Sequence, residues 1–417
     1  MCKLTEYLKN YIFIDENEIL ELITNSKKKT KIDTVNINGN DIKRYINEFW
    51  TAKQRQAVSI HEISYRACFK PQLPAFFIKL LTREKDTVYD PFAGRGTTPI
   101  EAALLNRNII FNDINPLSQI LTIPRFLIPE LSDIKNRLES ININYNEKAD
   151  IDLSMFYHSK TESEIVSIKK YLQNRSEENN EDYIDRWVRM VSTNRLTGHS
   201  PGFFSVYTLP PNQSVTQESQ IKINKKRNQT PEYKDVKSII LKKSKSLVRN
   251  ITNTDVENLK CAYHNGLFLN TDSIYTSNIP DEAVQLTVTS PPFLNIVQYS
   301  KDNWLRCWFN SIDDKEISRK ITMSKTIEDW SNVMGNVFKE LYRITKIGGW
   351  VAFEVGEVKN GKIKLDEYVV PLGISAGFEC EGVIINLQEF TKTSNIWGVN
   401  NNKSGTNTNR IVLFSKN

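Results

Sequence analysis

Ser290, Pro291, Pro292 and Phe293 form the stretch of this sequence best suited to chemistry. They follow a short run of β-forming residues, Leu286 to Thr289. Two consecutive prolines fix φ twice and remove two backbone donors, so the strand has to end there with unpaired carbonyl oxygens. Open α/β sheets bind ligands at the carboxyl ends of their strands. The pattern therefore predicts a rigid group of hydrogen-bond acceptors, and a tight surface turn without a ligand is the alternative.

A second stretch, Asp90-Pro91-Phe92-Ala93-Gly94-Arg95-Gly96-Thr97-Thr98, has the composition of a ligand-binding turn. It follows a short strand at 87–89 and precedes a helix at 99–106. Gly94 and Gly96 have no Cβ, so the backbone can turn sharply and approach a ligand. We expect Thr97 or Thr98 to cap the helix. The pattern is neither G-x-G-x-x-G nor a Walker loop, because no Gly-Lys-Ser/Thr follows.

A third carboxylate, Asp113, stands 23 residues after Asp90, at the end of a predicted strand at 108–112. In a βαβ unit this spacing places the carboxylate at the tip of the neighbouring parallel strand, where it can bind ribose hydroxyls. A helix N-cap is the alternative role, and the two roles are compatible.

These stretches resemble motifs of the amino-methylating DNA methyltransferases. Asp90 to Thr98 resembles motif I, the loop that cradles S-adenosylmethionine, and Asp113 matches motif II. The segment Phe69 to Leu81 resembles motif X, which lies beside the cofactor. Thr289 to Phe293, TSPPF, resembles motif IV in the form of the cytosine-N4 branch, because the adenine-N6 branch more often carries Asp or Asn at position 290. The resemblance covers roughly residues 65–125 and 260–417.

The resemblance implies the fold and the roles of the site residues. The fold would be an α/β, seven-stranded Rossmann-like sheet that uses S-adenosylmethionine, with a large inserted recognition region. Ser290 Oγ and the Pro291 carbonyl would accept the two hydrogens of the target amino group, and Phe293 would stack on the flipped base. Eight residues would contact the cofactor. Seven of them lie in or near motifs I and II, and the eighth follows the strand at 265–269: Asp90, Phe92, Ala93, Gly94, Gly96, Thr97, Asp113 and Asp272. Arg95 stands where relatives often have serine, and it receives no contact.

The predicted organisation has four parts. Residues 1–50 form a mostly helical preface, 51–125 the cofactor-binding half, 126–255 an inserted target-recognition region, and 256–417 the catalytic half. We expect one helix in the insertion, at 184–191. The insertion precedes the segment that resembles motif III, the strand at 265–269 with Asp272 after it, whereas the family's α arrangement places it after that motif.

Residues 222–249 are strongly basic. They contain ten Lys and Arg residues against Glu232 and Asp235, a net charge of +8, whereas the whole chain carries +6. Clustered cations beside aromatic residues favour a surface that follows nucleic-acid phosphates, and a solvated charged face is the alternative. The DNA-binding candidates are Lys225, Lys226, Arg227, Lys242 and Lys243.

The composition limits the class of protein. Of 417 residues, 39% are hydrophobic and 25% charged, as in soluble globular proteins. No apolar run of about 18 residues predicts a membrane span, and the polar N-terminus does not resemble a signal peptide, so a cytoplasmic location is expected. The five cysteines form no CxxC pair and the four histidines are scattered, so neither a disulfide framework nor a metal site is expected.

The function predicted from the sequence is transfer of a methyl group from S-adenosylmethionine to N4 of a flipped cytosine in double-stranded DNA, at a specific site. A restriction-modification or defence system, with a cognate restriction endonuclease as partner, is the expected context. The alternatives are adenine-N6 methylation, methylation of an RNA base, and a catalytically silent DNA-binding module on the same fold.

Overall fold

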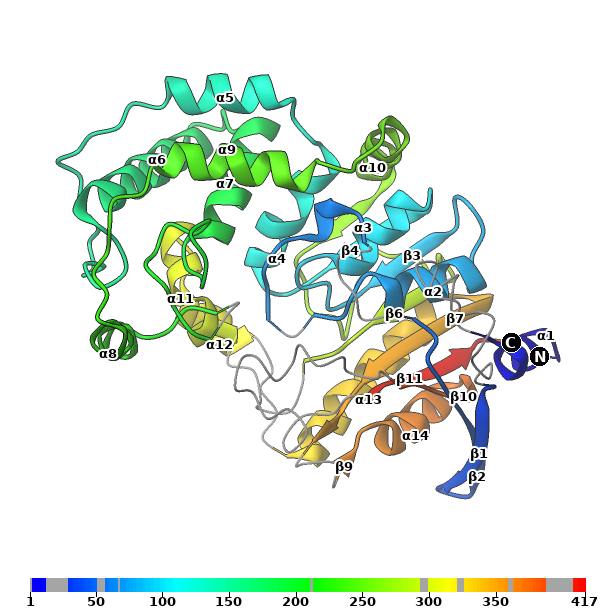
Figure 1. The fold of residues 1–417 in the computed structure, drawn as a ribbon. Helices are drawn as coiled ribbons and strands as arrows, with labels where there is room; N and C mark the ends of the chain where they lie inside the picture. The colour runs from blue at the N-terminus through cyan, green and yellow to red at the C-terminus, as the bar shows by residue number, and fades with distance from the viewer. Residues whose placement is uncertain are drawn as a thin grey trace, which may run out of the picture.

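A nine-stranded sheet with helices on both faces forms the centre of the molecule, and a helical unit lies beside it (Figure 1). The structure is a computed structural model that describes residues 2–12, 29–50, 57–66, 68–210, 213–292, 299–320, 326–358, 363–387 and 408–417. The strand order is β1-β2-β10-β11-β7-β6-β3-β4-β5. The strands span Lys31–Ile37 (β1), Asn40–Asn47 (β2), Thr87–Asp90 (β3), Asn108–Asn112 (β4), Leu267–Leu269 (β5), Val284–Thr289 (β6), Thr345–Val355 (β7), Glu379–Leu387 (β10) and Thr408–Ser415 (β11). A separate pair joins Glu357–Val358 (β8) to Ile363–Lys364 (β9).

Seven of the nine strands form the predicted α/β sheet. From β5 to β10 the neighbours are parallel except at β11, which pairs antiparallel with both β7 and β10. The prediction of seven strands was two short, because the hairpin β1-β2 extends this sheet by parallel pairing of β2 with β10. The fold is therefore the predicted α/β, Rossmann-like class with an enlarged edge.

The same hairpin corrects the expectation of a mostly helical preface. Only Cys2–Asn10 (α1) is helical among the described residues before position 50. Residues 31–37 are rich in β-branched side chains, and Asn38 and Gly39 both have positive φ, at 49° and 83°, as a type I′ turn requires. The Asn386 side chain then accepts from the Phe49 amide at 2.7 Å, which joins the end of the hairpin to β10.

Two hydrophobic clusters cover the two faces of the sheet. One includes residues of Gln72–Leu81 (α2), Thr97–Leu104 (α3), Pro116–Thr122 (α4) and Asn253–Asn265 (α10). The other includes residues of Ile327–Ile344 (α13) and Asp366–Ala376 (α14). Successive strand residues alternate between the clusters, as with Val88 and Tyr89. Tyr299–Phe309 (α11) and Asp314–Lys320 (α12) follow β6, and short 3-10 turns occupy Ser59–His61 and Ile123–Phe126.

The region between α4 and α10 is helical, whereas the sequence predicted a single helix in it. Its helices are Leu131–Ser140 (α5), Ser159–Glu177 (α6), Tyr183–Arg195 (α7), Gln217–Arg227 (α8) and Val236–Leu247 (α9). Their polar composition hides the apolar stripes, but capping signals were present. Asp182 begins α7 with a capping box, and Thr216 and Asp235 cap α8 and α9.

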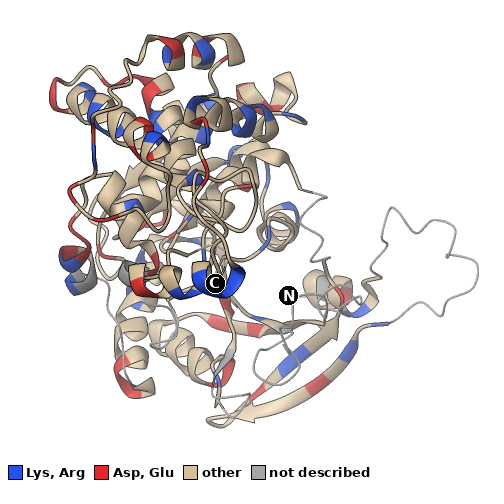
Figure 2. Ribbon diagram, turned by 60° about the vertical axis from the view of Figure 1, so that its left-hand side comes forward, with Lys and Arg blue, Asp and Glu red and all other residues tan. Residues whose placement is uncertain are grey.

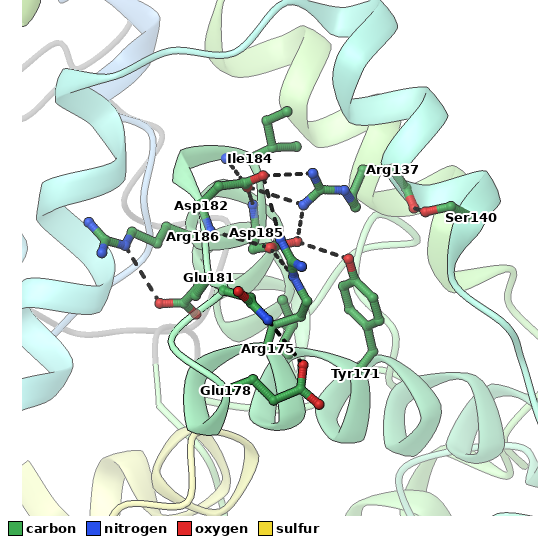
Figure 3. A network of polar contacts seen from close by, with 12 residues as sticks. Arg137, Ser140, Tyr171, Arg175, Glu178, Glu181, Asp182, Ile184, Asp185 and Arg186 are labelled. Carbon is green, nitrogen blue, oxygen red and sulfur yellow. Dashed lines mark hydrogen bonds and ion pairs between the residues drawn. The ribbon is translucent and has the colours of Figure 1, made fainter.

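A buried carboxylate ties three of these helices together (Figure 3). The Asp185 side chain is fully buried and accepts from Arg137 of α5 and from Arg175 of α6, the latter at 2.9 Å. Asp182 receives a second bond from Arg137 at 2.7 Å. Because breaking a buried ion pair leaves a charge uncompensated, this network fixes the relative positions of α5, α6 and α7. No helix within the described part of the chain has the length and apolarity needed to cross a membrane.

Candidate active site

The strand order reverses beside β3, and this is where the candidate site lies. From β3 the chain goes through β4 to β5 on one side, and β6 and β7 then add on the other. Such a reversal opens a crevice at the carboxyl ends of the strands. A cavity with an empty volume of about 1040 Å³, open to solvent, occupies that position. Its lining includes seven of the eight predicted cofactor residues: Asp90, Phe92, Ala93, Gly94, Thr97, Asp113 and Asp272.

Gly96, the eighth, is buried behind the cavity and shapes the turn instead of lining it. Its φ is +74°, and a Cβ there would lie 2.2 Å from Thr122 Cγ2. Gly96 is itself the N-cap of α3, without a side-chain cap bond, so the prediction that Thr97 or Thr98 caps the helix was wrong. The Thr98 hydroxyl donates to the Val288 carbonyl at 3.0 Å, which ties the glycine turn to β6.

Asp90 is a buried carboxylate shared between the two motifs. Its Oδ1 accepts from the Thr289 hydroxyl at 2.6 Å and from the Phe92 amide at 3.1 Å. Burial raises the pKa of Asp90 to about 7, although these hydrogen bonds oppose the shift. The group therefore titrates near neutral pH, as is common for carboxylates at functional sites.

Asp113 is held in one orientation at the end of β4. Its two carboxylate oxygens accept from the Gly94 amide at 2.7 Å and from the Asn115 amide at 2.8 Å. Burial raises the pKa of Asp113 as well. The helix cap is Asn115, which accepts from Leu117 at the start of α4. Asp272 is exposed and accepts from the Ile274 amide at 3.1 Å.

The strand end at β6 brings Ser290 and Pro292 to the cavity. Pro291 is buried and is not part of the lining, and Phe293 lies outside the described residues. The indole of Trp330, at the start of α13, donates to the Pro292 carbonyl at 3.0 Å. The turn is therefore held from a second element, and sequence reasoning did not identify Trp330.

One apolar wall of the cavity comes from α13. Trp330, Val333, Met334 and Val337 line it, and they recur at the spacing of one helix face. The periodicity was readable in the sequence, but an apolar stripe does not reveal whether it faces a core or a cavity.

The opposite wall comes from the segment before α2, where the motif X resemblance was noted. Tyr65, Cys68 and Phe69 line the cavity there. Arg95 is buried and donates to the carbonyls of Ile63 at 2.8 Å and Phe69 at 3.3 Å. Arg95, to which no ligand contact was assigned, thus braces this wall.

The basic residues of 222–249 do not form one surface. Lys225 and Lys226 are exposed on α8, where the Arg227 guanidinium lies 3.8 Å from the Tyr207 ring centroid, and Lys242 is exposed on α9. The Lys243 side chain is only 11% exposed and lies 3.8 Å from Glu62, and burial lowers its pKa to about 8. Lys243 is therefore poorly placed to contact a DNA phosphate, because it lies on the face of α9 that packs against the rest of the protein.

Other cations of the stretch have structural partners. Lys237 donates to the Ile141 carbonyl at 2.7 Å, and Arg249 pairs with Glu62 at 2.5 Å. Figure 2 shows Lys and Arg interspersed with Asp and Glu over the helical unit. The exposed cations of the stretch are divided between α8, which carries Lys222, Lys225, Lys226 and Arg227, and the region of α9, which carries Lys242, Lys245 and Arg249. No group of three or more His, Cys, Asp and Glu among the described residues could hold a metal ion.

Comparison with known proteins agrees with this geometry. Residues 6–120 match the model of a DNA methylase family of the N6/N4 type. The chain is 30% identical over 133 residues to the type II methyltransferase M.MvaI of Kocuria varians, covering 30% of this chain and 29% of that protein. It is 26% identical over 311 residues to the type II methyltransferase M.BsoBI of Geobacillus stearothermophilus, covering 66% of this chain and 58% of that protein.

The matches thus span less than two thirds of the length of either relative. Among solved structures, the rRNA methyltransferase aviRa of Streptomyces viridochromogenes superimposes with a TM-score of 0.34 at 10% identity, covering 88% of this chain and 93% of that one. Nothing about this chain follows from a likeness at that level. The glycine turn, the serine-proline turn and these matches agree: over residues 6–120 the chain is similar to the N6/N4 family of DNA methylases.

Proposed function

We propose that this protein methylates the exocyclic N4 of a cytosine in double-stranded DNA. The observation that carries the proposal is the meeting of two motifs at one cavity. The glycine turn after β3 and Ser290 after β6 line the same space, and Thr289 and Thr98 bond the two strand ends together. A methyl donor and a target amino group bound there would be held within reach of each other.

The cavity has the chemistry that S-adenosylmethionine requires. Asp90, Asp113 and Asp272 line it, and none of the described lining residues is Lys or Arg. Carboxylates between apolar walls suit a ligand that carries a sulfonium and an ammonium charge. When bound, the cofactor supplies a methyl group activated by the sulfonium. Asp90 would face the ammonium end, Asp113 the ribose and Asp272 the adenine amino group.

The serine-proline turn would prepare the target. An exocyclic amino group is a poor nucleophile, because its lone pair is delocalised into the ring. Ser290 Oγ and the Pro291 carbonyl would accept its two hydrogens and direct the lone pair at the methyl group, for an in-line displacement. The base has to leave the duplex first, at a cost of roughly a few kcal/mol.

The helical unit would hold the duplex, with α8 as its contact to the phosphates. Gln220 and Asn224 anchor α8 by donating to the carbonyls of Tyr207 at 3.0 Å and Met155 at 2.8 Å. These amides fix a helix that is otherwise polar and leave Lys225 and Lys226 exposed. Two type II methyltransferases are relatives, so a restriction-modification role with a partner endonuclease is part of the proposal.

Nucleoside mass spectrometry tests the proposal. Unmethylated duplex DNA is incubated with the protein and S-adenosylmethionine, and the digest is analysed for methylated nucleosides. N4-methylcytosine is expected, because Ser290 replaces the Asp or Asn more common in the N6 branch. N6-methyladenine would contradict the base assignment and retain the mechanism. The Ser290→Ala variant is the negative control, with a rate about 100-fold lower and nearly unchanged cofactor affinity. Product on RNA alone, or no product at all, would contradict the proposal.

A further inference from the structure

Arginine is the last residue of both α7 and α8, and each of these two guanidinium groups is stacked on an aromatic ring. The Arg195 guanidinium carbon lies 3.9 Å from the centroid of the Phe203 ring. The Arg227 guanidinium carbon lies 3.8 Å from the centroid of the Tyr207 ring. A stacked guanidinium presents its N–H groups at the edge of its plane, and this is the geometry in which arginine binds a phosphate with two parallel hydrogen bonds.

The loop between the two helices holds both rings in place. Its ends meet at a bridge between Gly198 and Tyr207, where the Thr208 amide donates to the Gly198 carbonyl at 3.1 Å. The Phe203 ring packs directly on Gly198, because a Cβ there would lie 2.4 Å from the ring. Lys234 donates to the Phe203 carbonyl at 2.9 Å. The stacking surfaces are therefore fixed before any ligand binds.

Arg195 is only 9% exposed, and its hydrogen bonds go to uncharged groups. Its Nε and Nη2 donate to the main-chain and side-chain oxygens of Asn194, at 3.1 and 2.6 Å, which leaves Nη1 for a ligand. Arg306 of α11, 4% exposed, likewise donates to Asn303 at 2.9 Å and to the Ser64 carbonyl at 3.0 Å. In the described part of the chain, neither guanidinium has a carboxylate as its counter-ion.

The charges around Arg195 do not compensate it. Burial and then the charge of Arg306 lower the pKa of Arg195 to about 10, against an opposing effect of Glu62. Glu62 is itself paired with Arg249 at 2.5 Å and lies 3.8 Å from Lys243. Because an uncompensated positive charge in surroundings of low dielectric attracts an anion strongly, the free edge of Arg195 favours an anionic ligand.

The two arginines lie at the two ends of a route from α8 to the cavity. Asn194, next to Arg195, donates to the Ser64 carbonyl at 3.0 Å, and the following residue, Tyr65, lines the cavity. Arg227 ends α8, the helix with exposed lysines. The loop between them lies beside α11, which follows the serine-proline turn in the chain (Figure 1). Phosphate-binding groups at these two positions would lie along one approach to the cavity.

We propose that Arg195 and Arg227 bind two phosphates of one DNA strand and lead that strand from α8 to the cavity. The proposal rests on the methyltransferase function proposed above. Because both guanidinium groups are already held on aromatic rings, little side-chain freedom is lost when the phosphates bind. The contacts are to the DNA backbone, so they position the strand whatever its sequence and leave base recognition to other groups.

The experiment compares Arg195→Met, Arg227→Met and the double variant in binding to one unmethylated duplex, measured by fluorescence anisotropy over a range of salt concentrations. Methionine keeps an unbranched apolar side chain beside the ring and removes the charge. Each change should lower the slope of log K against log salt by about 0.9, and the double change by about 1.8. Affinity should fall about fivefold per change at roughly 0.15 M salt, and cofactor affinity, measured by calorimetry, should be nearly unchanged.

Arg83→Met is the matched control, because it removes the same charge from an exposed arginine before the amino end of β3, whereas the cavity lies at the carboxyl ends of the strands. Its salt slope should equal that of the wild type. A wild-type slope in Arg195→Met would overturn the proposal and leave the proposed function intact. A wild-type protein that binds no duplex would contradict the proposed function itself.

A second variant covers the case in which Arg195→Met does not fold. Arg195→Lys retains the charge but loses the planar fork and its stacking on Phe203. It should bind the duplex several-fold more weakly than the wild type, with nearly the same salt slope. Full wild-type affinity in Arg195→Lys would overturn the assigned contact.

Titration of the wild type with inorganic phosphate, followed by calorimetry, identifies the source of the anion. No saturable binding is expected, because a free phosphate is not joined to a second phosphate that would engage the other arginine. Saturable binding that Arg195→Met abolishes would indicate a site for a small anion and would overturn the assignment to DNA.

Discussion

Residues with ordinary chemistry acquire special properties in this cavity through their immediate surroundings. Asp90 illustrates this, because it is buried, shared between β3 and β6, and shifted to a pKa of about 7. Asp113 differs in detail, since two backbone amides fix both of its oxygens. The cavity thus presents one carboxylate whose charge depends on pH and a second whose direction is set by the backbone.

The shifted pKa of Asp90 predicts how cofactor binding depends on pH. A cation binds the ionised carboxylate, so affinity for S-adenosylmethionine should rise as the pH increases through about 7. It should fall again once the cofactor ammonium loses its proton, near the value of about 8 for α-amino groups. Asp90→Asn should abolish the rise and retain the fall, as measured by calorimetry on either side of these two values. A variant with the rise intact would show that another group is responsible.

The same shift has a consequence for stability with the opposite sign. Because the folded pKa lies above the ordinary value of 3.8, the folded protein retains a proton that the unfolded chain loses. The contribution of Asp90 to stability is therefore fully present below pH 3.8 and declines as the pH rises toward about 7. Asp90→Asn should remove this decline from the unfolding free energy measured in urea.

At the scale of elements, the positions of the site residues depend on how strands end. The turn after β3 requires a residue with positive φ at position 96, and it brings α3 close to Thr122 at the end of α4. Glycine meets both requirements because it has no Cβ. The turn after β6 is fixed by its prolines and held by Trp330 from α13. Each turn is thus held in place by contact with a helix that does not directly follow it, α4 for the first turn and α13 for the second.

Comparing Gly96→Ala with Gly39→Ala should distinguish the backbone cost of a positive φ from the steric overlap of an added Cβ. Both glycines have positive φ, but an added Cβ at Gly39 has no neighbour within 4 Å. Gly39→Ala should therefore cost only the backbone term, about 1 kcal/mol of unfolding free energy. Gly96→Ala adds the overlap with Thr122 and should cost about 1–3 kcal/mol more, with weaker cofactor binding. Equal costs in urea unfolding would show that α3 moves away from α4 without loss.

At the scale of the whole molecule, a nine-stranded sheet and a helical unit lie beside each other. The helical unit lies between β4 and β5 in the sequence, and this agrees with an insertion that precedes the motif III candidate. The limits of the recognition region remain a prediction. The strongly basic stretch of the sequence is distributed in space, and α8 carries four of its exposed cations.

Charge reversal on α8 should weaken DNA binding and reduce its dependence on salt. Each lysine that no longer neutralises a phosphate lowers the slope of log K against log salt by about 1, so Lys225→Glu with Lys226→Glu should lower it by about 2. Lys9→Glu with Lys79→Glu is the matched control, because both lysines are exposed on α1 and α2 and the change in net charge is the same. Fluorescence anisotropy on one duplex measures both pairs. Identical slopes for the two pairs would remove α8 from the interface.

The sequence by itself determined the parts of the molecule that local chemistry dictates. Two prolines after a β-forming run end a strand, and a carboxylate followed by spaced glycines makes a turn, whatever the rest of the chain does. This is why β3, β4 and β6, with Asp90, Asp113 and Ser290 at their ends, could be placed from composition and spacing. The hairpin β1-β2 was also readable, since Asn38-Gly39 is a strong turn signal.

The tertiary structure alone decided which distant groups meet. Trp330 and Tyr65 reach the site from α13 and from the segment before α2. Their types and local patterns are those of ordinary core residues, so no local signal marks them. The same holds for the cations of 222–249, because burial and ion pairing depend on which helix faces which. A local pattern sets backbone conformation over a few residues, whereas long-range packing sets the environment of a side chain, and here the environment decides the chemistry.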